Sequence, residues 1–175
     1  SVEGFRTVLS SGCGGGLVNL ERYLSVLPEI SSEFSSAHQV LEEIMNEMYA
    51  RFRNPATRWE GSHCAAISRT DASADMLMAS DIGRHNAVDK VIGMGFLADW
   101  DFGYSVLATS GRLSSDMVLK AHRAGIPIVI SQHSVTSMAI EIASAARIAL
   151  VSRIGRRDED VFGDRHRITN TVNVV

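Results

Sequence analysis

Apolar residues recur along this chain with two different periods, one typical of helices and one typical of strands. The clearest helical period runs over residues 36–53, where apolar positions three or four residues apart share one face. These positions are Val40, Leu41, Ile44, Met45, Met48 and Phe52. Ser36 and Gln39 have the spacing of a capping box at the start of this helix, and Asn54 and Pro55 end it.

Strand-like runs surround this helix and then alternate with further helical segments. Residues 63–69 and 75–82 flank a polar turn at 70–73 and predict an antiparallel pair. We also predict strands at 5–10, 104–109, 127–131 and 148–152, and helical segments at 17–24, 86–97, 114–124 and 137–147. Because parallel strands need crossover connections, the alternation predicts an α/β fold, a three-layer α/β/α sandwich with a mixed, mostly parallel sheet.

Composition narrows the class of protein. A length of 175 residues with 45% hydrophobic residues fits a single domain over 1–175. The formal net charge of −3 offers no broad positive field, so we expect neither nucleic acid nor a membrane as a partner. No apolar run approaches the roughly 20 residues that a membrane helix needs. Two cysteines are too few for a disulfide scaffold, so we expect a cytoplasmic protein.

The two ends of the chain carry separate expectations. The chain starts at Ser1 and has no methionine before Met45, so we expect that an N-terminal portion is missing. Residues 153–175 form a charged C-terminal segment, densest in charge over 153–167 and poor in apolar residues. We therefore predict a surface segment that is mobile or is ordered by a ligand.

The stretch SSGCGGG, residues 10–16, surrounds a single thiol with glycines. Glycine frees the backbone and lets a partner approach closely, so the loop gives Cys13 the access that a reactive thiol needs. An incidental cysteine in a flexible loop is the alternative. No lysine or histidine in the loop lowers the pKa of the thiol, so activation must come from elsewhere.

Three predicted strand-to-helix junctions, residues 80–86, 109–114 and 134–137, all contain serine, and the first two also contain glycine. In an open α/β sheet such junctions meet at the carboxyl edge of the strands, where free helix amides bind phosphate. Arg84 and Arg112 each follow a glycine, and His85, Asn86, Asp89 and Lys90 add polar groups nearby. Ordinary helix caps, and a surface pair of Arg84 with Asp81, are the alternatives.

A zinc site built from Cys13, Cys64, His63 and His85 lacks the close ligand pairs of structural zinc sites. We therefore expect no stable metal site. Cys64 is predicted to be a buried packing residue, and His63 to be hydrogen-bonded in the core.

Four segments, taken in their order along the chain, resemble the FdhD/NarQ formate dehydrogenase accessory proteins. They are GSHCAA (61–66), DIGRHNAVDKVIG (81–93), SGRLSSDMVLKAHRAGIP (110–127) and TSMAIEIA (136–143). The resemblance implies a fold like that of cytidine deaminases, in a homodimer. It also implies a sulfurtransferase: a cysteine desulfurase loads sulfur onto a loop cysteine, and the persulfide delivers it to molybdenum bis-molybdopterin guanine dinucleotide for formate dehydrogenase.

The resemblance assigns roles to residues of this chain. The persulfide position is Cys13. The cofactor segment near the C-terminus matches Arg153, Ile154, Gly155, Arg156, Arg157 and Asp158. The three junctions are expected to hold the transiently bound cofactor through Gly83, Arg84, His85, Asn86, Asp89, Lys90, Ser110, Gly111, Arg112, Thr136 and Ser137.

The chain also departs from the family pattern. Family members commonly have C-G-x-C-G in the loop, whereas residues 13–17 read CGGGL and hold one thiol. Val135 replaces the proline of a P-T-S motif, and Arg153 stands where an aromatic residue is usual. Two alternatives remain open: a non-catalytic chaperone for a guanine dinucleotide cofactor, and a deaminase-fold nucleotide enzyme. A zinc deaminase needs H-x-E, but His63 is followed by Cys64 and Ala65.

Overall fold

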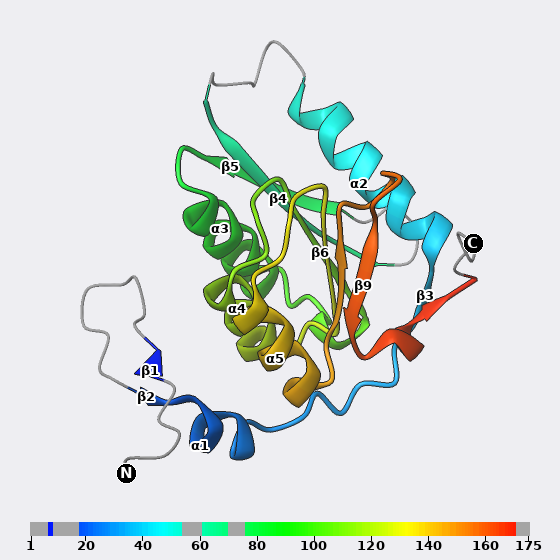
Figure 1. Ribbon diagram of the computed structural model, residues 1–175. Coiled ribbons are helices and arrows are strands. Elements are labelled where there is room, and N and C mark those ends of the chain that lie inside the picture. Colours follow the sequence, from blue (N-terminus) through cyan, green and yellow to red (C-terminus); the bar gives the residue numbers. More distant parts are fainter. Residues whose placement is uncertain (1–6, 9–17, 54–60, 70–75, 171–175) are drawn as a thin grey trace.

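The fold is centred on a six-stranded mixed sheet in the order β5-β4-β6-β7-β8-β9 (Figure 1). The computed structural model describes residues 7–8, 18–53, 61–69 and 76–170. The strands of the sheet are β4 (His63–Ser68), β5 (Met76–Asp81), β6 (Val106–Thr109), β7 (Ile128–Ser131), β8 (Ala149–Ser152) and β9 (Asp160–Gly163). The pairings β6–β7 and β7–β8 are parallel, whereas β4 pairs with β5 and β6, and β8 with β9, in antiparallel fashion.

Helices cover both faces of the sheet, as Figure 1 shows. The longer helices are α2 (His38–Phe52), α3 (Arg84–Leu97), α4 (Ser115–Ala124) and α5 (Ser137–Ala146). Smaller elements are α1 (Leu20–Ser25), the 3₁₀ turns η1 (Phe102–Tyr104) and η2 (Arg165–Arg167), and the two-residue strands β1 (Thr7–Val8), β2 (Val18–Asn19), β3 (Ser36–Ala37) and β10 (Ile168–Thr169). β1 pairs with β2, and β3 pairs with β10.

Alternate residues of the central strands point into two separate cores. On β4, Cys64 and Ala66 pack toward α2, whereas Ala65 and Ile67 pack toward α3, α4 and α5. These four residues are fully excluded from water, and burying one large aliphatic side chain is worth roughly 1.5–3 kcal/mol before entropy is subtracted. The predicted three-layer α/β fold is therefore confirmed, with a mixed sheet whose parallel part is its centre.

Most helix boundaries lie within two residues of the sequence predictions, but α1 begins at Leu20, three residues later than predicted, because residues 18–19 form β2. α4 ends at Gly125, whose φ of 80° is the left-handed conformation expected of a C-terminal glycine stop. The predicted capping box at α2 is wrong, because the cap position is Ala37 and no side chain caps the helix. Ser36 instead belongs to β3, where it pairs with Ile168.

The C-terminal segment is far more ordered than its charge density predicts. Residues 160–163 form the edge strand β9, whose Val161 and Phe162 pack toward opposite faces of the sheet. The prediction of a surface segment holds for the exposed residues 155–158, whereas 161–164 are half-buried and Arg167 and Ile168 are buried. None of the helices in the described residues is long and apolar enough to cross a membrane.

Arg167 fixes this segment from within. Its side chain is only 4% exposed and donates hydrogen bonds to the carbonyls of Arg147 (2.8 Å), Phe34 (2.9 Å) and Ile30 (3.4 Å). Burial lowers the pKa of its guanidinium, and nearby Asp164 opposes that shift. One arginine thus joins the end of α5, the segment before α2 and the C-terminal turn.

Candidate functional site

The three central strands end together at one edge of the sheet, which we call the carboxyl edge. Thr109, Ser131 and Ser152, the last residues of β6, β7 and β8, are in register and form a row. β4 runs in the opposite direction, so its first residue, His63, lies at the same edge and pairs with Asp81 of β5. The predicted junctions therefore do meet at one edge of the sheet.

Two hydroxyl groups of this row, those of Thr109 and Ser131, hold the loops that follow the strands. Thr109 Oγ1 accepts a hydrogen bond from the backbone N–H of Gly111 at 3.1 Å. Ser131 Oγ donates to the carbonyl of Gly111 at 2.7 Å and accepts from the N–H of His133 at 3.0 Å. The N–H of Leu113 donates to the carbonyl of Ser134, and its carbonyl accepts from the N–H of Thr136, both at 3.0 Å. These two bonds connect the loop after β6 to the loop after β7. The backbone of the edge is fixed by the protein's own hydrogen bonds.

Ser110 connects the edge to β4. Its Oγ accepts from the N–H of Cys64 at 2.9 Å and lies 3.3 Å from Nδ1 of His63. Burial raises the pKa of the Cys64 thiol to about 11, and the contact with Ser110 only partly offsets that effect. Because only the thiolate is nucleophilic, Cys64 is an inert packing residue, as predicted. His63 is hydrogen-bonded, as predicted, but it is half-buried at the end of β4 rather than in the core.

Arg84, at the start of α3, lies against Gly111. A methyl group added at Gly111 would stand 2.8 Å from Cδ of Arg84, so this close approach requires glycine. Nε of Arg84 is buried and has no hydrogen-bond partner within the described part of the chain. Leaving a buried donor unpaired costs about 1–3 kcal/mol, which an anionic ligand at this position would relieve.

Positive side chains from separate segments gather around His133, in the loop after β7. Burial lowers the pKa of His133, and the neighbouring Arg156, His63 and Arg112 lower it further. Arg156 also acts on Tyr49, whose pKa is raised mainly by burial. This part of the edge, which we call the basic cluster, is suited to an anion such as phosphate.

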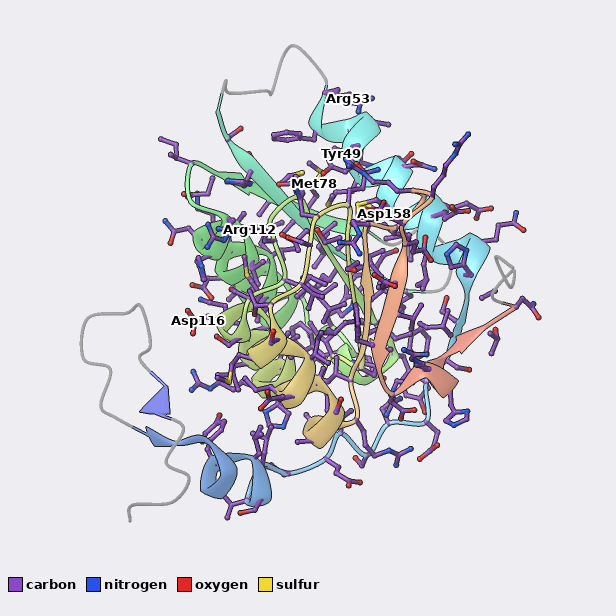
Figure 2. The ribbon with its side chains drawn as sticks, in the orientation of Figure 1. Tyr49, Arg53, Met78, Arg112, Asp116 and Asp158 are labelled. Atoms are coloured by element: carbon purple, nitrogen blue, oxygen red, sulfur yellow. The ribbon has the colours of Figure 1, made fainter. Side chains whose placement is uncertain are left out.

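Sequence reasoning missed two residues of this region, Tyr49 and His133. Tyr49 lies on α2, and Arg53 stacks over it with its guanidinium carbon 5.7 Å from the ring centroid. Figure 2 shows Tyr49 and Arg53 toward the upper end of the sheet, with Arg112 on the α3 side and Asp158 on the α2 side. The position of His133 just after a strand was an available signal. No signal separates Tyr49 from an ordinary packing residue.

His85, Asn86 and Asp89 form a second group, along a groove of about 800 Å³ between α3 and α4. Asp89 forms an ion pair with Lys120 across this groove. Burial lowers the pKa of His85, and the charge of Arg84 adds to the effect. The predicted site residues are therefore divided between the carboxyl edge and this helical groove.

Asp81 engages Lys90 and Asn86 at the start of α3. Lys90 Nζ lies 2.5 Å from Oδ2 of Asp81, while Asn86 Nδ2 and the N–H of Gly83 donate to Oδ1 at 3.1 and 2.9 Å. These contacts, that of Lys90 above all, lower the pKa of Asp81 to about 2. Asp81 thus pairs with Lys90 rather than with Arg84, and the three side chains organise the junction.

The loop after β8 is a compact turn. Arg153 and Gly155 have φ angles of 55° and 75°. Arg153 Nε donates to the carbonyl of Asp158 at 2.6 Å, and its Nη2 lies 2.5 Å from Oδ2 of Asp160. The end of the loop and the start of β9 therefore satisfy the guanidinium of Arg153.

The remaining members of the predicted C-terminal set lie differently. Ile154 is buried, and its N–H donates to the carbonyl of Ser131 at 3.1 Å, which places the loop beside the end of β7. Arg156 and Arg157 are exposed, and the charge of Arg156 reaches the basic cluster. Arg156 is thus the member of this set that is best placed to meet an anion.

The third junction starts α5. Oγ1 of Thr136 accepts from the N–H of Ala139 at 3.4 Å and caps the helix, and Ser137 is its first residue. Thr136 therefore has the capping role that was the plain alternative to ligand binding. Cys13 and the rest of the glycine loop at 10–16 lie outside the described residues.

Comparisons with known proteins identify relatives of this arrangement. A Mycobacterium tuberculosis protein named sulfur carrier protein FdhD is 39% identical over 126 residues, which cover 71% of this chain and 45% of the relative. The protein of the same name from Agrobacterium fabrum is 31% identical over 160 residues, covering 90% of this chain and 58% of the relative. The chain thus spans about half the length of these relatives.

A solved structure shares the fold. It is the crystal structure of a protein described as a formate dehydrogenase accessory protein from Desulfotalea psychrophila, with a TM-score of 0.70 and 28% identity. The match covers 85% of this chain and 62% of that protein. The model of the FdhD/NarQ family matches residues 2–169. This chain belongs to the FdhD/NarQ family.

Proposed function

We propose that this protein is a cytoplasmic sulfur carrier that serves formate dehydrogenase. Cys13 takes sulfur from a cysteine desulfurase as a persulfide and passes it to molybdenum bis-molybdopterin guanine dinucleotide, the cargo bound at the carboxyl edge. One observation carries the proposal: Arg84 lies against Gly111, and Arg112 and Arg156 lie near His133, in the loops where the parallel strands end, in a family whose curated relatives are named sulfur carriers.

The first step is an exchange between two sulfur compounds. The Cys13 thiolate attacks the outer sulfur of a persulfide on the desulfurase, the S–S bond to the desulfurase cysteine breaks, and that cysteine leaves as a thiolate. One S–S bond forms as another breaks, so no external oxidant is needed. The glycines around Cys13 give the sulfur access to the desulfurase and then to the bound cofactor.

The carboxyl edge supplies what a dinucleotide needs. Arg112 and Arg156 offer forked donors to phosphate oxygens, and the unpaired Nε of Arg84 offers a third contact. The amides at the start of α4 add the partial positive charge of a helix N-terminus. The loops that carry these groups are already fixed, so little entropy is lost when the ligand binds.

The persulfide is tested by sulfur loading. The protein is incubated with a cysteine desulfurase and cysteine labelled with radioactive sulfur, and compared with Cys13→Ala and with Cys64→Ala as a matched control. We expect label on the wild type and Cys64→Ala and none on Cys13→Ala. Equal label on the wild type and Cys13→Ala would eliminate the mechanism.

The cofactor site is tested separately with guanosine diphosphate as the probe. Arg112→Ala is expected to weaken binding by about 10- to 100-fold, the loss typical of a charge-assisted hydrogen bond, and Arg165→Ala to leave it unchanged. Binding that survives Cys13→Ala, with no persulfide on the wild type, would identify a cofactor chaperone instead. Release of ammonia from a nucleoside would identify a deaminase. We also expect a homodimer, which light scattering measures.

A further inference from the structure

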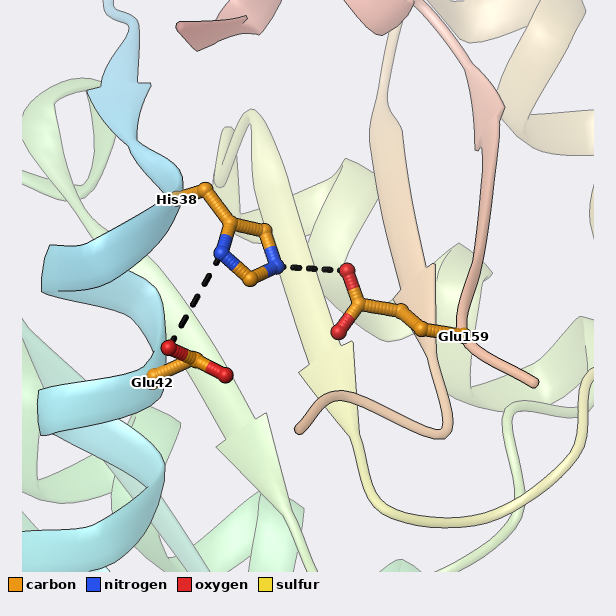
Figure 3. A group of neighbouring side chains, drawn as sticks. All are labelled: His38, Glu42 and Glu159. Carbon is orange, nitrogen blue, oxygen red and sulfur yellow. Dashed lines mark hydrogen bonds and ion pairs between the residues drawn. The ribbon is translucent and has the colours of Figure 1, made fainter. Parts of the chain in front are cut away.

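Three metal-ligating side chains meet on the α2 side of the sheet, remote in sequence from one another. His38 is the first residue of α2, and Glu42 follows one helical turn later, so both project from the same face of the helix. Glu159 comes from the loop between β8 and β9. Figure 3 shows the imidazole of His38 between the two carboxylates. We call these three residues the His38 cluster.

The distances within the cluster are short. Nε2 of His38 lies 2.5 Å from Oε1 of Glu159, and Nδ1 lies 4.0 Å from Oε2 of Glu42. One ligand atom from each residue can be chosen so that all three lie within 4.8 Å of one another. Tetrahedral zinc holds ligand atoms roughly 3.3–3.5 Å apart, so binding requires the His38 ring and the glutamate side chains to turn until both carboxylates face one ring nitrogen.

The charge of the cluster favours a cation. In the described part of the chain, His38 is the sole ion-pair partner of both Glu42 and Glu159. Two carboxylates therefore share one imidazole, and the cluster is net negative in either protonation state of the ring. The side chains of His38 and Glu159 are only 16% and 18% exposed, so water screens this charge incompletely.

The residues around the His38 cluster hold Glu159 in position and leave an open cavity beside Glu42. The N–H of Gly155 donates to Oε2 of Glu159 at 2.8 Å, the kind of outer contact that orients a ligating carboxylate. Glu42 lines a cavity of about 170 Å³ together with Asn46 and Gln132. That volume has room for a water molecule beside Glu42.

We propose that the His38 cluster is a binding site for a divalent cation of the zinc type. One imidazole nitrogen and two carboxylate oxygens form a mixed ligand set that zinc accepts, with water in the fourth position. Because His38 and Glu42 belong to α2 and Glu159 to the loop after β8, the cation joins these two segments. This site is separate from the proposed sulfur transfer, and neither depends on the other.

Metal binding is measured on the full chain carrying Cys13→Ser, which removes the thiol as a competing ligand. Calorimetry with Zn²⁺ and absorption with Co²⁺ are expected to show one equivalent bound. His38→Gln, Glu42→Gln and Glu159→Gln are each expected to weaken Zn²⁺ binding at least about tenfold. Glu47→Gln is the matched control, since Glu47 lies on the same helix and pairs only with Arg51 within the described residues.

A second measurement reports the link between the segments. Zn²⁺ is expected to slow hydrogen exchange at the N–H of Gly155, and Glu42→Gln, which leaves the Gly155–Glu159 contact in place, is expected to abolish this slowing. His133→Gln tests for a competing site at the carboxyl edge. Failure to bind Zn²⁺ or Co²⁺ at micromolar concentration, or binding lost in His133→Gln and kept in the three cluster variants, would overturn the proposal.

Discussion

The centre of the sheet and the C-terminal segment are ordered by different forces. β6, β7 and β8 are buried on both faces by apolar side chains, so their stability rests on burial of apolar area. The C-terminal segment from Arg153 to Thr169 adds to the apolar contacts of Val161 and Phe162 a set of directional polar contacts, above all those of Arg167. The apolar composition of the central strands therefore predicts that they are ordered, whereas the charged composition of the C-terminal segment does not predict its order.

The largest expected effect on the free energy of unfolding comes from Arg167, whose hydrogen bonds hold the C-terminal segment. Arg167→Ala leaves the carbonyls of Ile30, Phe34 and Arg147 without their donor, so we expect a loss of about 3–5 kcal/mol in the free energy of unfolding. Urea unfolding measures the loss. Arg165→Ala, an exposed change two residues away, is expected to stay within about 0.5 kcal/mol. Equal, small effects of both changes would show that the segment is held by apolar contacts alone.

The buried centre has its own sensitivity, to alkaline pH. The pKa of Cys64 is raised to about 11 in the folded protein, so its contribution to stability is complete below the pKa of the unfolded thiol and declines as the pH rises toward 11. We expect a decline of about 2–3 kcal/mol from this group. Urea unfolding at pH 8 and pH 11 measures it, and Cys64→Ala should lack this part of the decline. Identical pH dependence in both proteins would contradict the raised pKa.

Two glycines of α3 test how tightly the centre is packed. A methyl group at Gly95 would lie 2.6 Å from Cζ of Phe102 and 2.8 Å from Cδ1 of Ile67, whereas one at Gly93 would meet nothing within 4 Å. Gly95→Ala is expected to destabilise the protein by about 1–3 kcal/mol. Gly93→Ala should stabilise it by about 0.5–1 kcal/mol through helix propensity. Thermal unfolding compares them, and a stabilising Gly95→Ala would show a loosely packed interface.

The smallest effect is expected at an exposed ion pair of the C-terminal segment. Arg153 contacts Asp158 and Asp160, but its side chain is 30% exposed and those of its partners are 68% and 50% exposed. Arg153→Ala is therefore expected to cost less than about 1 kcal/mol, and less still at high salt. Urea unfolding at low and high salt checks this, and a loss as large as that of Arg167→Ala would remove the distinction between exposed and buried anchors.

Sequence patterns predicted the parts of the fold that depend on local periodicity. The alternation of strands and helices from β6 to β8 is visible because each element carries its own apolar signal. β9 is hidden because Val161 and Phe162 stand among charged residues, and their burial depends on pairing with β8. The wrong capping box at Ser36 has a similar cause, since its strand partner is Ile168, far along the chain.

Sequence patterns predicted the backbone positions of the candidate site but not its side-chain contacts. A topological rule brings the junctions carrying Arg84 and Arg112 to one edge, whatever the details of packing. The same rule does not reveal Tyr49, which reaches the site from a helix on one face of the sheet. Nor does it reveal that Lys90 and Asn86 are engaged by Asp81, because that depends on side-chain geometry.

The contact of Gly111 with Arg84 has an evolutionary consequence. Since even one methyl group at position 111 would collide with the aliphatic part of the Arg84 side chain, the residue at one position limits which residues the other position accepts. Lineages that lose the glycine should also replace the arginine with a smaller side chain, and those that keep the arginine should keep the glycine. Substitutions at 84 and 111 are therefore expected to be inherited as a pair.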